Sequence, residues 1–166
     1  ADFDVRDSEV FEISVATGEL TQLTDRFGPD GGPVLSPDGS LIAYTGFDDE
    51  YQGYQIARLY VMNRDGSGSR RISDLDRSFG GLSWAADGRG LYFQYDDQGM
   101  TKVAYVSLDG EVEDLAEHVG GVGLGRPYGG GSYTVAGNGR FAFTHTTPAH
   151  PADLAVGQRG SEARRV

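Results

Sequence analysis

Cysteine is absent from this sequence of 166 residues, and long apolar runs are absent as well. Without cysteine the chain forms no disulfide and offers no thiolate to a metal ion. No apolar run approaches the roughly 20 residues that a membrane-spanning helix needs, so we expect no membrane contact. No basic segment followed by an apolar one opens the printed sequence, and the compartment stays open between cytoplasm and periplasm.

Basic residues are also scarce, since 14 Lys and Arg stand against 25 Asp and Glu and give a net charge of −11. Phosphate backbones are bound by basic patches, so this balance argues against nucleic acid as a partner. The acidic residues gather early, because residues 1–54 hold 12 Asp and Glu but only 2 Arg. Two interpretations of this segment stay open: a surface that promotes solubility, or an acidic face that attracts cationic peptides.

Helical periodicity is the third missing feature, because no window repeats its apolar residues at helical spacing. A repeated turn is present instead. Asp or Asn followed by Gly between two apolar runs is a strong hairpin signal, since Gly adopts the positive φ of such turns. This signal recurs at Gly39, Gly88 and Gly139, which are 49 and 51 residues apart. Spacing of this size predicts a repeat architecture made of strands.

A second kind of hairpin alternates with the first, and its turns lie at Gly18, Gly66, Gly110 and Gly160. The first kind predicts the two inner strands of a four-stranded unit, and the second kind predicts the two outer strands. Four-stranded units repeated every 40 to 50 residues, roughly, are typical of a β-propeller. We therefore predict an all-β chain, an incomplete β-propeller of about three and a half four-stranded antiparallel blades. The predicted units are a half blade at 1–28 and blades at 29–78, 79–117 and 118–166.

Two long connections lie on one face of the predicted propeller, at residues 47–55 and 118–132. Long loops on a rigid scaffold are where function usually resides. Exposed aromatic and arginine side chains on such loops commonly anchor a protein or peptide contact. The alternative for such residues is that they pack their own loops. We expect a domain-contact or peptide-contact site on this face, formed by Glu50, Tyr51, Tyr54, Arg126 and Tyr128.

Two acidic runs, Asp48-Asp49-Glu50 and Asp96-Asp97, are predicted to lie in equivalent connections between strands. Neither run matches the pattern of a calcium-binding loop. Solvated turn residues are the ordinary explanation, and a clamp for a cation or a peptide amine is the alternative. Trp84 falls on a predicted inner strand and is expected in the core.

No catalytic residue is predicted in the chain. A serine nucleophile elbow needs Gly-x-Ser-x-Gly, and the strings around Ser83 and Ser132 both lack the final glycine. The three histidines, His118, His145 and His150, show no metal-ligand spacing, and we interpret them as structural or solvated. The sequence therefore predicts no metal site and no cofactor.

Several strings nevertheless carry a family resemblance. The segments Tyr51-Gln52-Gly53-Tyr54, Leu59 to Ser67 and Leu91 to Asp97 resemble the propeller of serine peptidases of the prolyl oligopeptidase family, especially its acylaminoacyl-peptidase-like branch. Gly125-Arg126-Pro127-Tyr128 and Pro151-Ala152-Asp153-Leu154 resemble the last stretch of that propeller, in its C-terminal half. The Ser-Pro-Asp-Gly repeat is less specific, because the envelope propeller of the Tol system shares it.

In that family the propeller caps an α/β-hydrolase domain whose Ser, Asp and His perform the chemistry, and it restricts access to short peptides. The resemblance implies that this chain is a non-catalytic, substrate-gating piece of such a peptidase. Its expected partners are then the missing hydrolase domain and a short peptide substrate, and no catalytic residue is carried over. The alternative is a free-standing interaction module of the bacterial envelope, like the Tol-system propeller.

The open ends of such a stack also predict self-association, because unpaired strands and uncovered apolar faces invite another chain. Two copies of about three and a half blades sum to about seven, a ring size that propellers use. A homodimer that closes a seven-bladed ring is therefore expected, with open-ended association as the competing outcome.

Overall fold

The computed structural model describes residues 7–121 and 130–166. Over these two ranges the chain forms 14 β-strands and no helix, and the strands make four antiparallel sheets. The first sheet has two strands, and each of the other three has four strands that follow one another in chain order. Every strand therefore pairs with its neighbour in sequence, which short connections between antiparallel strands favour.

The first sheet pairs β1 (Phe11–Ile13) with β2 (Leu20–Gln22). The second sheet contains β3 (Asp30–Leu35), β4 (Leu41–Gly46), β5 (Arg58–Asn63) and β6 (Arg70–Arg71). The third sheet contains β7 (Gly80–Trp84), β8 (Gly90–Asp97), β9 (Met100–Ser107) and β10 (Val112–Ala116). The fourth sheet contains β11 (Tyr133–Val135), β12 (Arg140–Thr147), β13 (His150–Gln158) and β14 (Ser161–Arg165).

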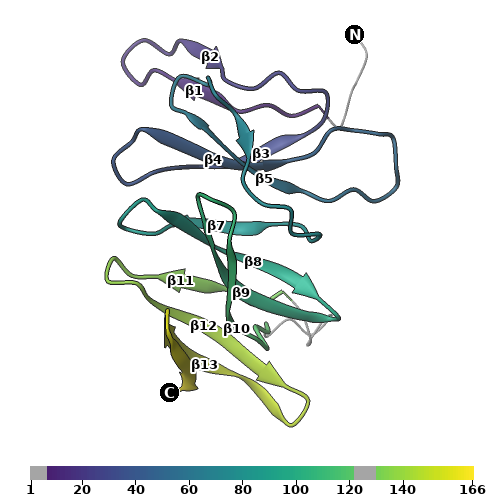
Figure 1. The fold of residues 1–166 in the computed structure, drawn as a ribbon, viewed down its shortest axis with the longest axis vertical. Coiled ribbons are helices and arrows are strands. Elements are labelled where there is room, and N and C mark those ends of the chain that lie inside the picture. The colour runs from purple at the N-terminus through teal and green to yellow at the C-terminus, as the bar shows by residue number, and fades with distance from the viewer. Residues whose placement is uncertain (1–6, 122–129) are drawn as a thin grey trace.

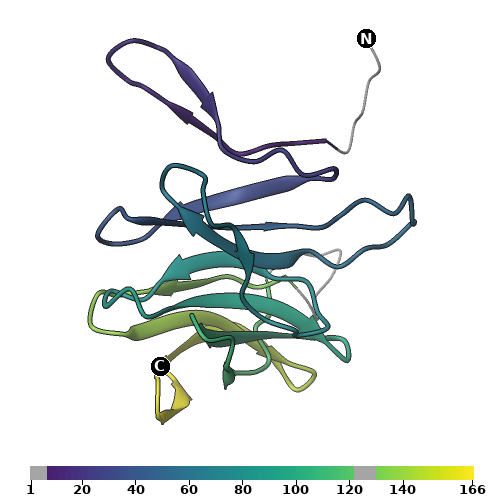
Figure 2. The same cartoon turned by 45° about the horizontal axis from the view of Figure 1, so that its top comes forward.

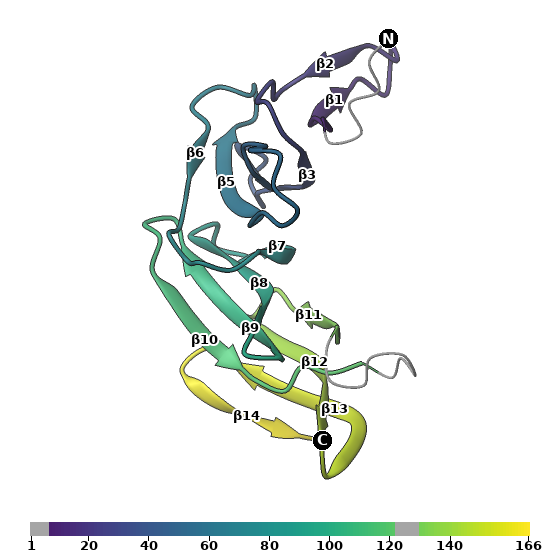
Figure 3. The ribbon, with the colours of Figure 1, turned by 90° about the vertical axis from the view of Figure 1, so that its right-hand side faces the viewer.

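The four sheets are stacked face to face, from the first sheet near the N-terminus to the fourth sheet at the C-terminus (Figure 1, Figure 2). Seen from the side, the stack follows an arc whose two ends stay apart (Figure 3). This is the open, all-β arrangement that the repeated hairpins predict. The exact residues at which one blade gives way to the next stay a prediction.

The tight turns predicted from Asp-Gly and Asn-Gly are present, and Gly39, Gly88 and Gly139 all adopt a positive φ between 69° and 78°. In the first turn, the Asp38 carboxylate accepts hydrogen bonds from the Ser36 hydroxyl at 2.7 Å and from the Ser40 amide at 3.0 Å. These bonds favour the charged carboxylate and lower the pKa of Asp38 to about 2. The side-chain bonds that hold this turn therefore persist at neutral pH.

The main core lies between the second and third sheets, where Phe93 is fully buried in one cluster with Ala43 and Val61. Trp84 packs at the margin of this cluster, only partly buried, and its indole N–H donates to the Val34 carbonyl oxygen at 3.0 Å. The core position predicted for Trp84 is thus only partly right, because the indole nitrogen needs a polar partner, which the backbone of the neighbouring sheet supplies.

Two further cores join the remaining sheets. Between the third and fourth sheets, Tyr92 and Tyr105 are buried together with Phe141 and Phe143. A smaller core between the first and second sheets comprises Val10, Ile42, Tyr44 and Met62. Apolar burial is therefore continuous along the stack, as expected of sheets that each cover their neighbour.

The prediction that Asp96 and Asp97 lie in a connection is wrong, because both residues belong to β8. The strands β8 and β9 pair as far as Asp97 and Met100, which leaves only residues 98–99 as a turn. Asp97 accepts a hydrogen bond from Arg77 at 2.8 Å, and this bond lowers the pKa of the carboxyl. Asp97 therefore forms ion pairs, with Arg77 and also with Lys102 at 3.5 Å, and is not a solvated turn residue.

Candidate functional site

The connections between the second and third strands of the four-stranded sheets lie on one edge of the stack, which we call the loop face. It carries residues 47–57 between β4 and β5, residues 98–99 between β8 and β9, and residues 148–149 between β12 and β13. In Figure 1 these connections lie on the right, and the short hairpins of the first strand pairs lie on the left. The first connection is much the longest of the three, and it presents the site residues predicted from the sequence.

The loop of residues 47–57 is fixed at its root by the backbone. The Asp49 amide donates to the Phe27 carbonyl oxygen at 2.9 Å. Gly28 lies against Phe47, the residue that follows β4. It has a φ of 136°, and any Cβ atom at this position would collide with the carbonyl oxygen of Phe47. Only glycine lets the two segments approach this closely.

An ion pair of Arg26 and Asp30 supports the same root. The Asp30 side chain is fully buried, and Arg26 Nη2 donates to its carboxylate. The Arg26 guanidinium also lies 4.1 Å from the centre of the Tyr60 ring and 3.5 Å from the Asp48 carboxylate. Burial raises the pKa of Asp30, and the charge of Arg26 opposes that rise. Gly46 leaves the space in which this pair sits, since a Cβ atom there would overlap both side chains.

Asp49 holds the inside of the loop together. Its Oδ1 atom accepts hydrogen bonds from the Tyr51 amide at 2.8 Å and from the Gln55 side-chain amide at 2.7 Å, and the residue is buried. The prediction that this acidic run consists of solvated turn residues is therefore wrong for Asp49. A turn that folds back on itself leaves amide groups that need an acceptor, and this carboxylate provides it.

The braced loop presents two tyrosines to solvent. Tyr51 is 78% exposed, has a φ of 58° and leans on the Phe27 ring with ring centres 5.6 Å apart. Tyr54 is 74% exposed. Glu50 is exposed as well, and its carboxylate accepts a hydrogen bond from the Gln52 side chain at 2.7 Å. The other two predicted site residues, Arg126 and Tyr128, lie outside the described residues.

Tyr54 stands between two hollows of the loop face. One hollow of about 460 Å³ lies against the loop itself and is lined by Asp48, Glu50 and Tyr54 together with Arg58 and Arg71. The second, of about 360 Å³, lies toward the third sheet. Its lining includes Tyr54, Arg77, Phe79, Gln94, Tyr95 and Thr101. A ligand that covered the Tyr54 ring would therefore reach two carboxylates and two guanidinium groups on one side, and mainly neutral groups on the other.

A third hollow, which sequence reasoning missed, lies between the two short connections of the loop face. It measures about 610 Å³, and its lining is mainly apolar with two imidazoles and several hydroxyls. The side chains that define it are Met100, Val119, Pro148, Pro151, His118 and His150. These residues come from three separate segments, so spacing alone could not bring them together. Pro148 within the 148–149 turn and Pro151 just after it were the available signal.

The histidines gather at this end of the molecule. The rings of His118 and His145 are 6.1 Å apart, and burial lowers the pKa of His145. His145 therefore stays neutral at pH 7, which agrees with a structural role. Among the described residues no group of three or more His, Asp or Glu side chains is placed to hold a metal ion.

We expect truncation of the exposed Tyr54 to leave the stability of the protein almost unchanged, and truncation of the buried Asp49 to lower it. Tyr54→Ala should leave the free energy of unfolding within about 0.5 kcal/mol, since it removes a surface side chain. Asp49→Ala should cost about 1–3 kcal/mol, because the amide groups that it now satisfies lose their acceptor. Urea unfolding measures both. A loss of several kcal/mol in Tyr54→Ala would show that the ring packs the loop rather than serving a partner.

Known proteins resemble parts of this chain in sequence. No protein-family model matches the chain. A stretch of 71 residues is 31% identical to dipeptidyl-peptidase 5 of Porphyromonas gingivalis, covering 42% of this chain and 10% of that protein. A stretch of 67 residues is 33% identical to the Tol-Pal system protein TolB of Francisella tularensis, covering 39% of this chain and 14% of that protein. The matches therefore span only a small part of either relative.

Solved structures resemble nearly the whole chain. TolB from Acinetobacter baumannii superposes with a TM-score of 0.64 at 17% identity, over 95% of this chain and 37% of that one. The β-propeller domain of the Trilobed protease from Pyrococcus furiosus gives 0.62 at 17% identity, over 95% and 49%. Puromycin hydrolase gives 0.62 at 21% identity, over 86% of this chain and 22% of the hydrolase.

The fold class predicted from the sequence is thereby confirmed. The protein is an all-β, incomplete β-propeller whose stacked sheets do not close into a ring. Its structural neighbours include TolB, the β-propeller domain of a protease and puromycin hydrolase, so the fold leaves the choice between TolB and the hydrolases open. No described segment forms a helix that is long and apolar enough to cross a membrane.

Proposed function

We propose that this chain is a non-catalytic propeller segment of a serine peptidase of the prolyl oligopeptidase family, in the acylaminoacyl-peptidase-like branch and the C-terminal half of its propeller. In this role its loop face meets the hydrolase domain and the short peptides that the enzyme cleaves. The observation that carries the proposal is the loop of residues 47–57, which is braced by hydrogen bonds yet leaves two tyrosines largely exposed, one of them between two hollows. Exposed aromatic rings on a rigid support are typical anchors of protein and peptide contacts.

The charges of the loop face favour the binding of a short peptide with a free amino end. Asp48 and Glu50 line the hollow beside Tyr54, and the two arginines that share it, Arg58 and Arg71, are each paired with another carboxylate. An α-ammonium group would be attracted to these carboxylates, while apolar side chains of the peptide would fit the largely apolar hollow around Met100 and Pro148. The similarity to dipeptidyl-peptidase 5 points in the same direction.

The second candidate is a free-standing interaction module of the bacterial envelope. The observation in its favour is the similarity to TolB, in both sequence and structure. In that role the same exposed tyrosines would contact a protein partner instead of a substrate peptide.

The coding sequence around this segment distinguishes the two candidates. The peptidase proposal expects a Gly-x-Ser-x-Gly motif within about 150 residues downstream, on the usual size of a domain. Flanking sequence that continues without such a motif would overturn the peptidase proposal and favour the interaction module.

We expect no hydrolysis of acyl-peptide or dipeptidyl chromogenic substrates by the 166-residue chain. The sequence contains no nucleophile motif, so turnover should not exceed that of a buffer blank. Two independent preparations should be assayed, each with and without a serine-directed covalent inhibitor. Activity that persists in both preparations and disappears with the inhibitor would contradict the non-catalytic role.

A further inference from the structure

The first and fourth sheets, at the two ends of the stack, each present one face that no other sheet covers. The uncovered face of the fourth sheet carries the same residue types as a face of the second sheet that the third sheet covers. On the second sheet, Ala43 pairs with Val61 and Thr45 pairs with Leu59. On the fourth sheet, Ala142 pairs with Val156 and Thr144 pairs with Leu154. The two quartets have the same four residue types, in the same register and with the same spacing.

Within the molecule, the quartet of the second sheet is a docking surface for a neighbouring blade. Ala43, Leu59 and Val61 are buried against large apolar side chains of the third sheet, among them Phe93. The quartet of the fourth sheet faces away from the third sheet, because Phe143 and Ala155, which alternate with it, are the residues that point inward. Leu154 of this outer quartet is 49% exposed.

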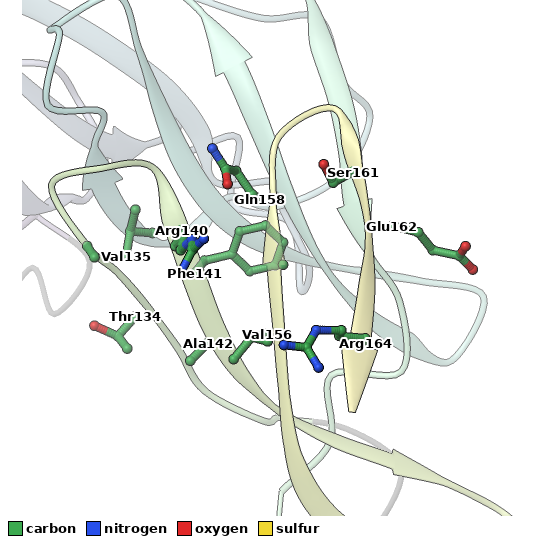
Figure 4. A pocket seen from close by; sticks show the side chains of 12 residues that line it. Thr134, Val135, Arg140, Phe141, Ala142, Val156, Gln158, Ser161, Glu162 and Arg164 are labelled. Atoms are coloured by element: carbon green, nitrogen blue, oxygen red, sulfur yellow. The ribbon is translucent and has the colours of Figure 1, made fainter. Parts of the chain in front are cut away.

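The outer face of the fourth sheet is also hollowed. At the position where the third sheet has the paired Tyr92 and Tyr105, the fourth sheet has only Ala142 and Val156. A hollow of about 450 Å³ results, and Figure 4 shows its lining. Arg140 and Arg164 stand at this hollow with one carboxylate, Glu162, and none of the three forms an ion pair with another described residue. A partner must therefore bring bulky apolar side chains, and negative charge would favour it.

The first sheet has those properties. Ile13 pairs with Leu20, and Phe11 lies on the same side of the sheet. These three side chains are 50–64% exposed, whereas Val10 and Glu12, which alternate with them, face the second sheet. Exposed carboxylates that lack an ion-pair partner among the described residues flank the two strands in the sequence. They are Asp7, Glu19 and Asp25.

We propose that the outer face of the first sheet of one copy docks on the outer face of the fourth sheet of a second copy. Two such junctions close a ring of two chains. The two-stranded first sheet takes a full place in the stack, because it covers the second sheet with a core of its own. Two copies of four sheets therefore supply eight positions rather than the seven expected from the strand count, still within the range of known propellers. This inference concerns the 166-residue chain by itself and does not rest on the peptidase proposal, in which further blades of a longer protein would cover the same two faces.

Light scattering coupled to size exclusion tests the pairing at micromolar concentration. The chain should elute at twice its mass of 17.8 kDa. Leu20→Arg and Leu154→Arg each place a charge in one of the two faces, at side chains that are already half exposed, and each variant should be monomeric. Leu35→Arg is the matched control, since Leu35 is equally exposed but lies on neither face, and it should remain dimeric.

Mixing the two interface variants makes the test specific. Leu20→Arg keeps the face of the fourth sheet intact, and Leu154→Arg keeps the face of the first sheet intact. These two intact faces are the ones that dock on each other, so a 1:1 mixture should recover a two-chain species. A monomeric wild-type chain, a dimer that survives either substitution, or a mixture that stays monomeric would each overturn the proposed pairing. Open-ended growth of the wild-type chain would overturn the closed ring. Far-ultraviolet circular dichroism checks that both variants are folded.

Discussion

Phe93→Ala is expected to cost about 3–5 kcal/mol in the free energy of unfolding, a large share of the stability of a domain this size. Phe93 is fully buried between the second and third sheets, and its ring centre lies 4.4 Å from that of Phe79. Truncation removes apolar burial and leaves a cavity that the two sheets cannot collapse without shifting relative to each other. Urea unfolding measures the loss.

Phe27→Ala is the matched control for that substitution. Phe27 is 48% exposed, and its one aromatic neighbour among the described residues is Tyr51, so the change should cost about 1 kcal/mol or less. Equal losses in the two variants would contradict the placement of the main core between the second and third sheets.

Arg26→Leu should be the second most damaging substitution, with a loss of about 3–5 kcal/mol at neutral pH. It would leave the Asp30 carboxylate buried without its cationic partner, and an uncompensated buried charge is far more costly than the pair is stabilising. The root of the 47–57 loop would loosen with it, since Asp48 also faces this guanidinium.

The loss should depend on pH in a defined direction. Burial already raises the pKa of Asp30 above that of the unfolded chain, and removal of Arg26 raises it further. At a pH between the pKa of Asp30 in the unfolded chain and its higher pKa in the folded variant, the folded state holds a proton that the unfolded state has released. Stability therefore falls as pH rises through this range. Arg26→Leu should therefore be nearly tolerated near pH 4 and most damaging near pH 7, on the ordinary carboxyl pKa.

Adding Asp30→Asn to Arg26→Leu provides the control. The double variant carries no buried charge at this position, so it should regain part of the stability and lose the added pH dependence. A loss in Arg26→Leu that is the same at both pH values would show that packing against Tyr60, rather than charge compensation, is what Arg26 contributes.

The repeated turns made the fold predictable, because their chemistry is local. Gly39, Gly88 and Gly139 mark the inner hairpins in the sequence and adopt the positive φ that such turns need. The ion pairs, and the hydrogen bonds that hold the loops, were harder to predict from the sequence. Asp49 and Asp97 sit in similar acidic runs, yet one satisfies its own loop and the other pairs with Arg77, and both outcomes depend on where distant segments lie.

The candidate site was predictable in part. Tyr51 and Tyr54 could be assigned to the loop face because a long connection interrupts an otherwise regular repeat. The hollow around Met100 and Pro148 could not, since it exists only where two hairpins far apart in the chain stand side by side. The repeated Ala-x-Thr and Leu-x-Val strings at Ala43 and Ala142 were visible in the sequence, but their meaning depends on which sheet faces are covered.

The central claim is that the loop face is the binding surface for short peptides, and amide chemical-shift mapping tests it directly. The probe is the tripeptide amide Ala-Ala-Phe-NH₂, with its N-acetylated form as the control that lacks the ammonium group. The shifted amides should lie in residues 47–57 and around the 98–99 and 148–149 turns, and acetylation should weaken binding. Tyr54→Ala should weaken it about tenfold, the effect of losing about 1.4 kcal/mol of contact energy. Shifts confined to the short hairpins on the opposite edge, or equal binding by wild type and Tyr54→Ala, would contradict the account.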